Sequence, residues 1–143
     1  MVSRMNTRRP SWAWLFFVQV VLVIAASVLA TRGALPSGVF QPPLDKVGHL
    51  GAYGLLAFLG VRAFGPSRRW QVIGALLAAS TLDELSQRAF PTRTFDLSDL
   101  GMNVLGILVL GWLAAWRARH VDTSLSKAAE PTDVVVRHVR RLR

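Results

Sequence analysis

The sequence contains no cysteine among its 143 residues, so disulfide bridges, thiolate nucleophiles and cysteine-ligated metal centres are excluded. Histidine is also scarce. Of the three histidines only His49 lies in a hydrophobic part of the chain, and the histidine pair of acid phosphatases is missing. No serine stands in a nucleophile motif. Acidic residues number eight, against 17 lysines and arginines. These absences leave few side chains that could act in catalysis or bind a metal.

The chain is instead rich in hydrophobic sequence, which makes up 52% of its residues. A helix needs about 20 residues to cross a hydrocarbon core of about 30 Å. Stretches of roughly that length occupy residues 12–30, 47–64, 70–90 and 100–116, although the third is apolar only over 72–82. They leave no room for a separate soluble domain. We therefore expect an all-α protein, a small membrane bundle of four transmembrane helices over residues 12–117. A basic N-terminus (1–11) precedes it, and a basic tail (118–143), expected to be disordered, follows.

The basic residues are distributed by compartment. If all four stretches cross the membrane, 13 of the 17 lysines and arginines precede the first, separate the second from the third, or follow the fourth. Positive residues favour the cytoplasm, so both termini and the tight hairpin predicted at Gly65-Pro66-Ser67 should be cytoplasmic. The net charge of +9 is thus a topology signal. We expect the lipid bilayer as a partner, and no nucleic acid.

The first stretch allows two interpretations. Three arginines before an apolar run ending in Val28-Leu29-Ala30 fit a secretory signal peptide. The run of about 19 residues exceeds the usual 7 to 15 of a signal core, and Trp12 and Trp14 suit an interfacial anchor. We expect an uncleaved, peripheral, lipid-facing helix; cleavage would leave the other three in the same orientation. Glycines such as Gly54 and Gly106 predict close packing among those three.

Polar side chains gather at one end of the last three stretches. Charges at membrane depth are costly, so they usually face one another or a wet cavity. Spacings of three and four place the members of each group on one helix face. The predicted topology brings the three groups to the outer side, which predicts one outward-facing polar site. Its members are Asp45, Lys46, His49 and Tyr53, then Glu84 and Gln87 beside Asp83, and finally Arg93, Asp96, Asp99 and Asn103.

Each group also has a structural explanation. Asp45 could cap a helix, Lys46 could extend to lipid headgroups, and His49 could be a packed histidine bonded to Asp45. Asp99 could cap its helix or pair with an arginine. Glu84, about four turns into its span, is the hardest to explain in this way.

These motifs carry a resemblance to a known family. Asp-Lys-x-x-His opening one span, Glu-x-x-Gln closing the next and Arg-x-x-Asp-x-x-Asp-x-x-x-Asn-x-x-Gly entering the last resemble VanZ-like membrane proteins. The resemblance covers about residues 40–116 and implies a helical bundle in the cytoplasmic membrane of a bacterium. It also implies an association with low-level resistance to the glycopeptide teicoplanin, as in the founding members, but it supplies no mechanism. The matching positions are Asp45, Lys46, His49, Tyr53, Glu84, Gln87, Arg93, Asp96, Asp99, Asn103 and Gly106.

The first functional hypothesis is a binding or shielding protein of the cell envelope. The ten polar positions of this motif would hold the headgroup of a lipid-linked cell-wall precursor, its D-Ala-D-Ala end or an anionic lipid headgroup. Lys46 and Arg93 would bind phosphate or carboxylate, the arginine through a bidentate fork. Glu84, Asp96 and Asp99 would accept hydrogen bonds from sugar hydroxyls or ammonium groups.

The alternative is a membrane enzyme acting on a lipid-linked phosphate or ester. His49, oriented by Asp45, would be the general base, and Glu84 is the second catalytic candidate. The sequence requires no cofactor, but a divalent cation would suit this chemistry, because oxygen ligands favour Mg²⁺, Ca²⁺ or Mn²⁺. Its candidate ligands are Glu84, Asp96, Asp99 and Asn103. Transport or proton-coupled movement is a third hypothesis.

Overall fold

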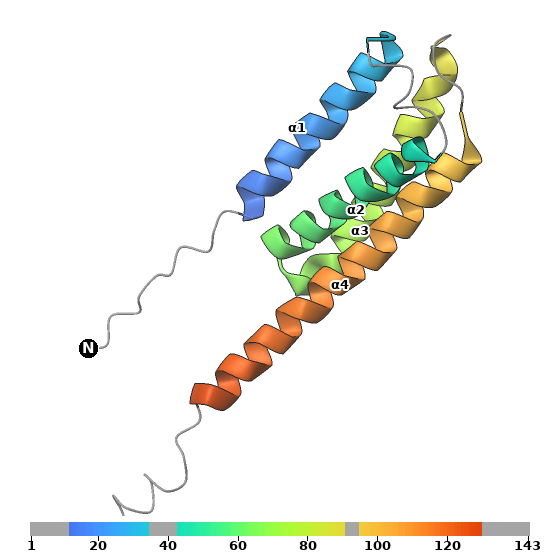
Figure 1. The fold of residues 1–143 in the computed structure, drawn as a ribbon. Helices are drawn as coiled ribbons and strands as arrows, with labels where there is room; N and C mark the ends of the chain where they lie inside the picture. The colour runs from blue at the N-terminus through green and yellow to red at the C-terminus, as the bar shows by residue number, and fades with distance from the viewer. Residues whose placement is uncertain (1–11, 35–42, 91–94, 130–143) are drawn as a thin grey trace, which may run out of the picture.

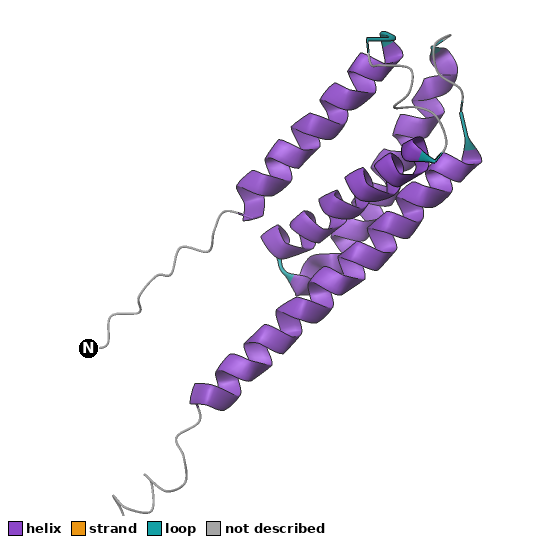
Figure 2. Ribbon diagram, in the orientation of Figure 1, coloured by secondary structure: helices purple, strands orange, loops and turns teal. Residues whose placement is uncertain are grey.

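The structure, a computed structural model, describes residues 12–34, 43–90 and 95–129, with side chains described as far as residue 120. These residues form helices joined by turns and contain no strand (Figure 2). The prediction of an all-α fold is confirmed. In chain order the elements are α1 (Trp12–Thr31), α2 (Leu44–Phe64), the short 3-10 helix η2 (Pro66–Arg68), α3 (Arg69–Ser86), the 3-10 helix η3 (Gln87–Ala89) and α4 (Leu97–Ala129).

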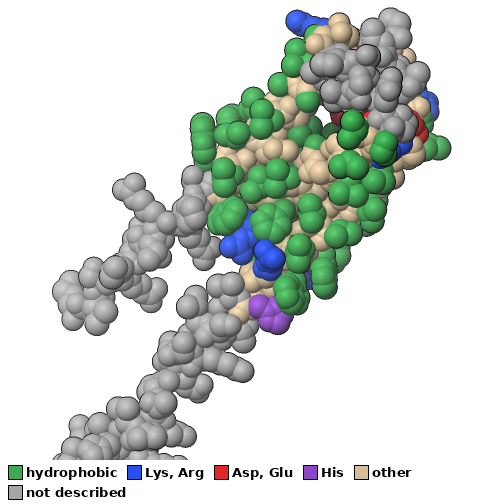
Figure 3. All heavy atoms as spheres, viewed as in Figure 1, with side chains coloured by type: hydrophobic (Ala, Val, Ile, Leu, Met, Phe, Trp, Pro, Cys, Tyr) green, Lys and Arg blue, Asp and Glu red, His purple; other side chains and the backbone are tan. Residues whose placement is uncertain are grey.

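Three of these helices are long and apolar enough to cross a bilayer: Trp12–Thr31, Leu44–Phe64 and, within α4, Leu97–His120. Hydrophobic side chains cover most of the visible face of these helices (Figure 3), as expected for a protein surrounded by lipid. The chain is therefore a helical membrane protein. The third predicted span corresponds to α3, which has 18 residues and carries charges near both ends. Four transmembrane helices, with both termini cytoplasmic, stay a prediction.

The helices begin and end at residues that favour such boundaries. Gly65 follows α2 with φ +93°, a conformation that side chains rarely adopt, and Pro66 then opens η2. This is the predicted hairpin. Asp96 immediately precedes α4, and its Oδ1 accepts hydrogen bonds from the backbone N–H and the hydroxyl of Ser98, both at 2.8 Å. At its far end α4 continues to Ala129, well beyond the predicted span, because residues 112–130 contain neither glycine nor proline.

Helices α2 and α4 form the centre of the bundle and approach each other at two glycines. A β-carbon on Gly106 would overlap the carbonyl oxygen of Leu50, and one on Gly54 would lie 3.1 Å from the carbonyl oxygen of Gly106. The backbones can come this close because neither glycine carries a side chain. The apolar core continues along α2, α3 and α4 and includes Leu56, Ala57, Val61, Val72, Ile73, Leu76, Ile107, Ala114 and Ala115.

Helix α1 lies beside α2 at the edge of the bundle (Figure 1). Only Ala30 of this helix is buried, which confirms the predicted peripheral position. Phe16 and Val20 pack against the core, and the Gln19 side-chain amide donates to the carbonyl oxygen of Ala52 at 3.3 Å.

The C-terminal ends of α1 and α3 and the N-terminal ends of α2 and α4 lie at one end of the bundle (Figure 1). We call this the polar end, and the opposite end, which carries Gly65 and η2, the hairpin end. The sequence predicts that the polar end faces outward and the hairpin end faces the cytoplasm.

Single cysteines test this orientation, because the chain has none of its own. Ala34, at the polar end, and Ser67, at the hairpin end, are both exposed. We expect Ala34→Cys to react with a membrane-impermeant thiol reagent in intact cells and Ser67→Cys to react only after lysis. The cysteine-free parent measures background labelling. Labelling of Ser67→Cys alone in intact cells would place the polar end in the cytoplasm and overturn the topology.

Candidate functional site

Lys46 lies at the centre of a group of carboxylates at the polar end. Its ammonium donates to Asp96 Oδ2 at 2.7 Å and to Asp99 Oδ1, and it lies 3.5 Å from Asp45 Oδ2. The side chain of Lys46 is 22% exposed, and those of Asp45 and Asp99 are 12% exposed. One ammonium therefore joins the first turn of α2 to the first turn of α4, and three carboxylates surround it.

His49 lies one turn further along α2 and contacts α4 through both ring nitrogens. Nδ1 is 3.1 Å from Asn103 Oδ1, and Nε2 is 3.6 Å from Asp99 Oδ2. The hypothesis that Asp45 orients His49 is not supported by these contacts. Although Asp45 shares the helix face, its carboxylate accepts the backbone N–H of Lys46 at 2.8 Å and faces the lysine ammonium. Asn103 is fully buried, and its amide nitrogen has no hydrogen-bond partner among the residues that the structure describes.

Glu84 is fully buried at the end of α3. One carboxylate oxygen accepts the backbone N–H of Asp96 at 3.0 Å, and the other accepts the side-chain amide of Gln87 at 3.2 Å. Glu84 therefore fixes the residue that caps α4 and that also binds Lys46. It adjoins the lysine cluster through this backbone contact.

Asp83, the neighbour of Glu84, faces different helices. Its carboxylate accepts hydrogen bonds from the hydroxyl of Ser27 on α1 at 2.8 Å and from the hydroxyl of Tyr53 on α2 at 3.0 Å. Tyr53 is buried and Asp83 is partly buried. This second polar group joins three helices and satisfies a carboxylate that would be costly to leave unpaired in lipid.

Asp96 lies just before α4, outside the apolar spans. The Lys46 ammonium, followed by the backbone and hydroxyl donors of Ser98, lowers the pKa of the Asp96 carboxyl from 3.8 to about 2. A lowered pKa means that ionised Asp96 stabilises the fold above pH 3.8 and that this contribution is lost as the pH falls towards 2. The ion pair with Lys46 is therefore intact at the pH values at which most cells grow.

The candidate metal ligands do not form a metal centre in the described residues. Asp96 and Asp99 share the ammonium of Lys46, whereas Glu84 bonds to Gln87 and to the backbone of Asp96. Among the described histidine and carboxylate side chains, no three are placed to hold a metal ion together. A lysine ammonium thus stands where a cation shared by Asp96 and Asp99 would lie. The metal-dependent hypothesis gains no support from this geometry.

The structure sorts nine of the ten candidate residues into three sets. Glu84 and Gln87 adjoin the cluster, Tyr53 belongs with Asp83, and Arg93 lies outside the described residues. Their roles in binding a ligand stay predictions. The members of the cluster itself are Asp45, Lys46, His49, Asp96, Asp99 and Asn103.

The sequence analysis did not identify Ser27 as a polar contact, because it expected the first helix to be peripheral and lipid-facing. Ser27 is a polar residue in an otherwise apolar span, which could have indicated a contact with another helix. The same is true of Gln19. In a membrane such side chains commonly hydrogen-bond to neighbouring helices. Their contacts with Asp83 and with the backbone of α2 follow this rule.

Comparison with known proteins gives a match at the level of a protein family. Searches of curated proteins and of solved structures found none that is significantly similar to this chain. The model of the VanZ/LLP1 family, in contrast, matches residues 3–119. That range contains α1, α2, α3 and every residue of the cluster around Lys46. The chain therefore belongs to the VanZ/LLP1 family.

Proposed function

We propose that this protein, in the cytoplasmic membrane of a bacterium, binds the headgroup of a lipid-linked cell-wall precursor at its polar end. In doing so it would alter susceptibility to teicoplanin. The observation that carries the proposal is the cluster around Lys46, in which charged side chains from two membrane helices meet at one end of the bundle. Charged side chains in membrane helices are rare and often mark functional sites. Family membership supports the link to glycopeptides.

The charge of the cluster favours one kind of headgroup chemistry. Three carboxylates surround one ammonium, so the described side chains carry more negative than positive charge while His49 is neutral. A phosphate or carboxylate at Lys46 would have to displace an aspartate that already holds it. Donor groups need not displace Lys46, because each carboxylate has about four lone-pair sites at which it can accept further hydrogen bonds. We therefore favour a ligand whose ammonium group or sugar hydroxyls donate hydrogen bonds to the aspartates. A phosphate of the same ligand would bind Arg93.

Glu84→Gln tests the need for an ionised carboxylate behind the cluster. Glutamine has nearly the same shape, and its amide oxygen can still accept the backbone N–H of Asp96, so the fold should be retained. We expect the variant to reach normal membrane abundance but to leave teicoplanin susceptibility equal to that of cells lacking the protein. The measurement is the minimal inhibitory concentration alongside a quantitative membrane blot.

Arg68→Gln is the matched control, because it also removes one charge and lies exposed at the hairpin end. It should change neither abundance nor susceptibility. If Glu84→Gln keeps full activity at normal abundance, the carboxylate acts only through hydrogen bonds, and the ionised-site proposal fails.

A further inference from the structure

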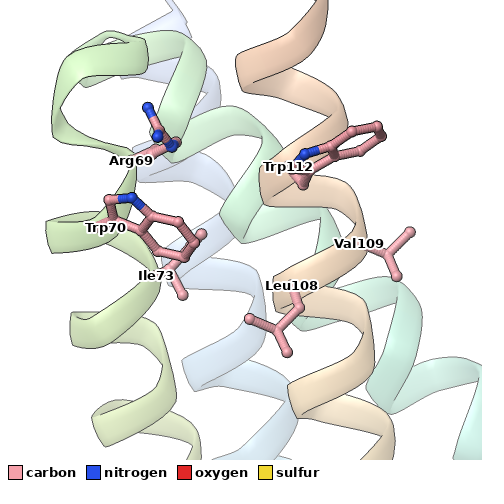
Figure 4. Close-up of a pocket in the computed structure, with 6 residues that line it drawn as sticks. All are labelled: Arg69, Trp70, Ile73, Leu108, Val109 and Trp112. Atoms are coloured by element: carbon pink, nitrogen blue, oxygen red, sulfur yellow. The ribbon is translucent and has the colours of Figure 1, made fainter.

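A groove of about 490 Å³ lies between α3 and α4, towards the hairpin end of the bundle. Ile73 forms part of its base and is 4% exposed, whereas Trp70 and Trp112 are 64% and 60% exposed. The two indole rings flank the groove from opposite helices (Figure 4). It therefore opens sideways, on the surface that hydrocarbon would cover. Its lining consists of Arg69, Trp70 and Ile73 from α3 and Leu108, Val109 and Trp112 from α4.

The side chains that line the groove favour an apolar ligand. Apart from the guanidinium of Arg69 and the two indole N–H groups, the lining side chains offer no hydrogen-bonding atoms. Water entering such a space would lack the two to four polar partners that keep it in place, whereas apolar cavities accept hydrocarbon. In a bilayer the available hydrocarbon is a lipid acyl chain. Shape and lining therefore fit one acyl chain between the tryptophans.

The positive charge of Arg69 at the groove favours a lipid with an anionic headgroup. Arg69 lies at its hairpin end (Figure 4), and its guanidinium donates to the carbonyl oxygen of Pro66 at 3.3 Å and lies 5.2 Å from the Trp70 ring centroid. A guanidinium has five N–H donors, so this bond leaves others that can bind a ligand. Arginine binds phosphate through two parallel hydrogen bonds. The five acidic side chains that the structure describes belong instead to the polar end and its hydrogen-bonded groups: Asp45, Asp83, Glu84, Asp96 and Asp99.

We propose that this groove is a binding site for an anionic phospholipid, with one acyl chain between Trp70 and Trp112 and the phosphate on Arg69. The predicted topology places the groove in the cytoplasmic leaflet, whose anionic lipids attract cations near the membrane surface. The lipid would cover a surface at which α3 and α4 leave space between them. This site is separate from the cluster around Lys46 and does not depend on the function proposed there.

Photocrosslinking in vesicles tests the proposal directly. The full chain is reconstituted with phosphatidylglycerol or phosphatidylethanolamine that carries the same diazirine-labelled acyl chain, and the adducts are located by mass spectrometry. We expect adducts concentrated on α3 and α4 at the lining residues, with phosphatidylglycerol favoured about fivefold, as one cation near the surface predicts. Arg69→Gln should abolish this preference while leaving acyl-chain adducts. Val109→Trp, which fills the groove, should remove adducts with both lipids.

Arg32→Gln is the control, because Arg32 is exposed and lies at the opposite, polar end of the bundle. It also removes one positive charge and should leave the labelling pattern unchanged. Equal labelling by the two lipids in the unmodified protein would overturn the headgroup assignment. Adducts spread evenly over the lipid-facing side of α1 would show that the groove has no specific occupant. Crosslinks between two copies of the chain at Trp70 and Trp112 would identify a second protomer as the occupant and would also overturn the proposal.

Discussion

Lys46→Met should lower the stability of the protein more than any other single charge removal described here. Methionine keeps most of the length of the side chain but leaves Asp45, Asp96 and Asp99 together without their shared cation. Because the Lys46 side chain is 22% exposed and that of Asp96 is 47% exposed, solvent screens part of this loss. We expect most of the destabilisation to come from Asp45 and Asp99, whose side chains are only 12% exposed. Thermal unfolding of the purified protein in detergent measures this loss.

Two companion variants separate the loss of the ion pairs from a general effect of removing charge. Arg32→Met removes a cation that is exposed near the same end, so it should be close to neutral. Adding Asp99→Asn to Lys46→Met should recover part of the lost stability, because it relieves the repulsion between unpaired carboxylates. If Lys46→Met unfolds at the same temperature as Arg32→Met, the lysine does not hold the cluster together.

Gly106→Ala should separate the two central helices. The new methyl group would overlap the carbonyl oxygen of Leu50, and a backbone atom cannot turn aside as a side chain can. Overpacking of this kind costs about 1 to 3 kcal/mol, and we expect the upper end here because α2 or α4 must shift as a whole. The variant should show reduced membrane abundance and a lower unfolding temperature in detergent.

The glycines of the same two helices provide a graded series. At Gly54 the nearest atom, at 2.7 Å, is Cδ1 of Leu110, the far end of a flexible side chain, so Gly54→Ala should cost less than Gly106→Ala. At Gly101, on α4, a β-carbon would meet nothing within 4 Å. Gly101→Ala should be neutral or slightly stabilising, because alanine favours a helix over glycine by about 1 kcal/mol. Equal stability of the Gly106 and Gly101 variants would contradict the close approach of α2 and α4.

Hydropathy and turn residues were sufficient to predict much of the fold. Apolar length located α1, α2 and the membrane part of α4, and the dihedral demands of Gly65 and Pro66 located the hairpin. The end of α4 was harder to predict, because the loss of hydrophobicity after Trp116 marks the end of a span and not the end of a helix. Composition alone does not show whether α3 crosses the membrane, because its middle is apolar whereas charged residues lie near both of its ends.

The polar residues show a different limit of sequence reasoning. Helical spacing identifies which side chains share a face, but it does not identify their partners on other helices. Asp83 and Glu84 were grouped together, yet the first bonds to α1 and α2 and the second bonds to the start of α4. Lys46 was likewise expected to hold an anionic ligand, because the sequence does not show that three aspartates surround its ammonium.

The bonds of Asp83 have a consequence for the assembly of the protein in the membrane. α1 and α2 precede α3 in the chain, so the hydroxyls of Ser27 and Tyr53 are already present when Asp83 is synthesised. α3 is less apolar than the three helices that are long and apolar enough to cross a bilayer. Its carboxylate can be taken into lipid at lower cost beside waiting donors than alone. In the predicted four-span topology, the two earlier helices therefore supply the hydrogen-bond donors that α3 needs when it enters the membrane.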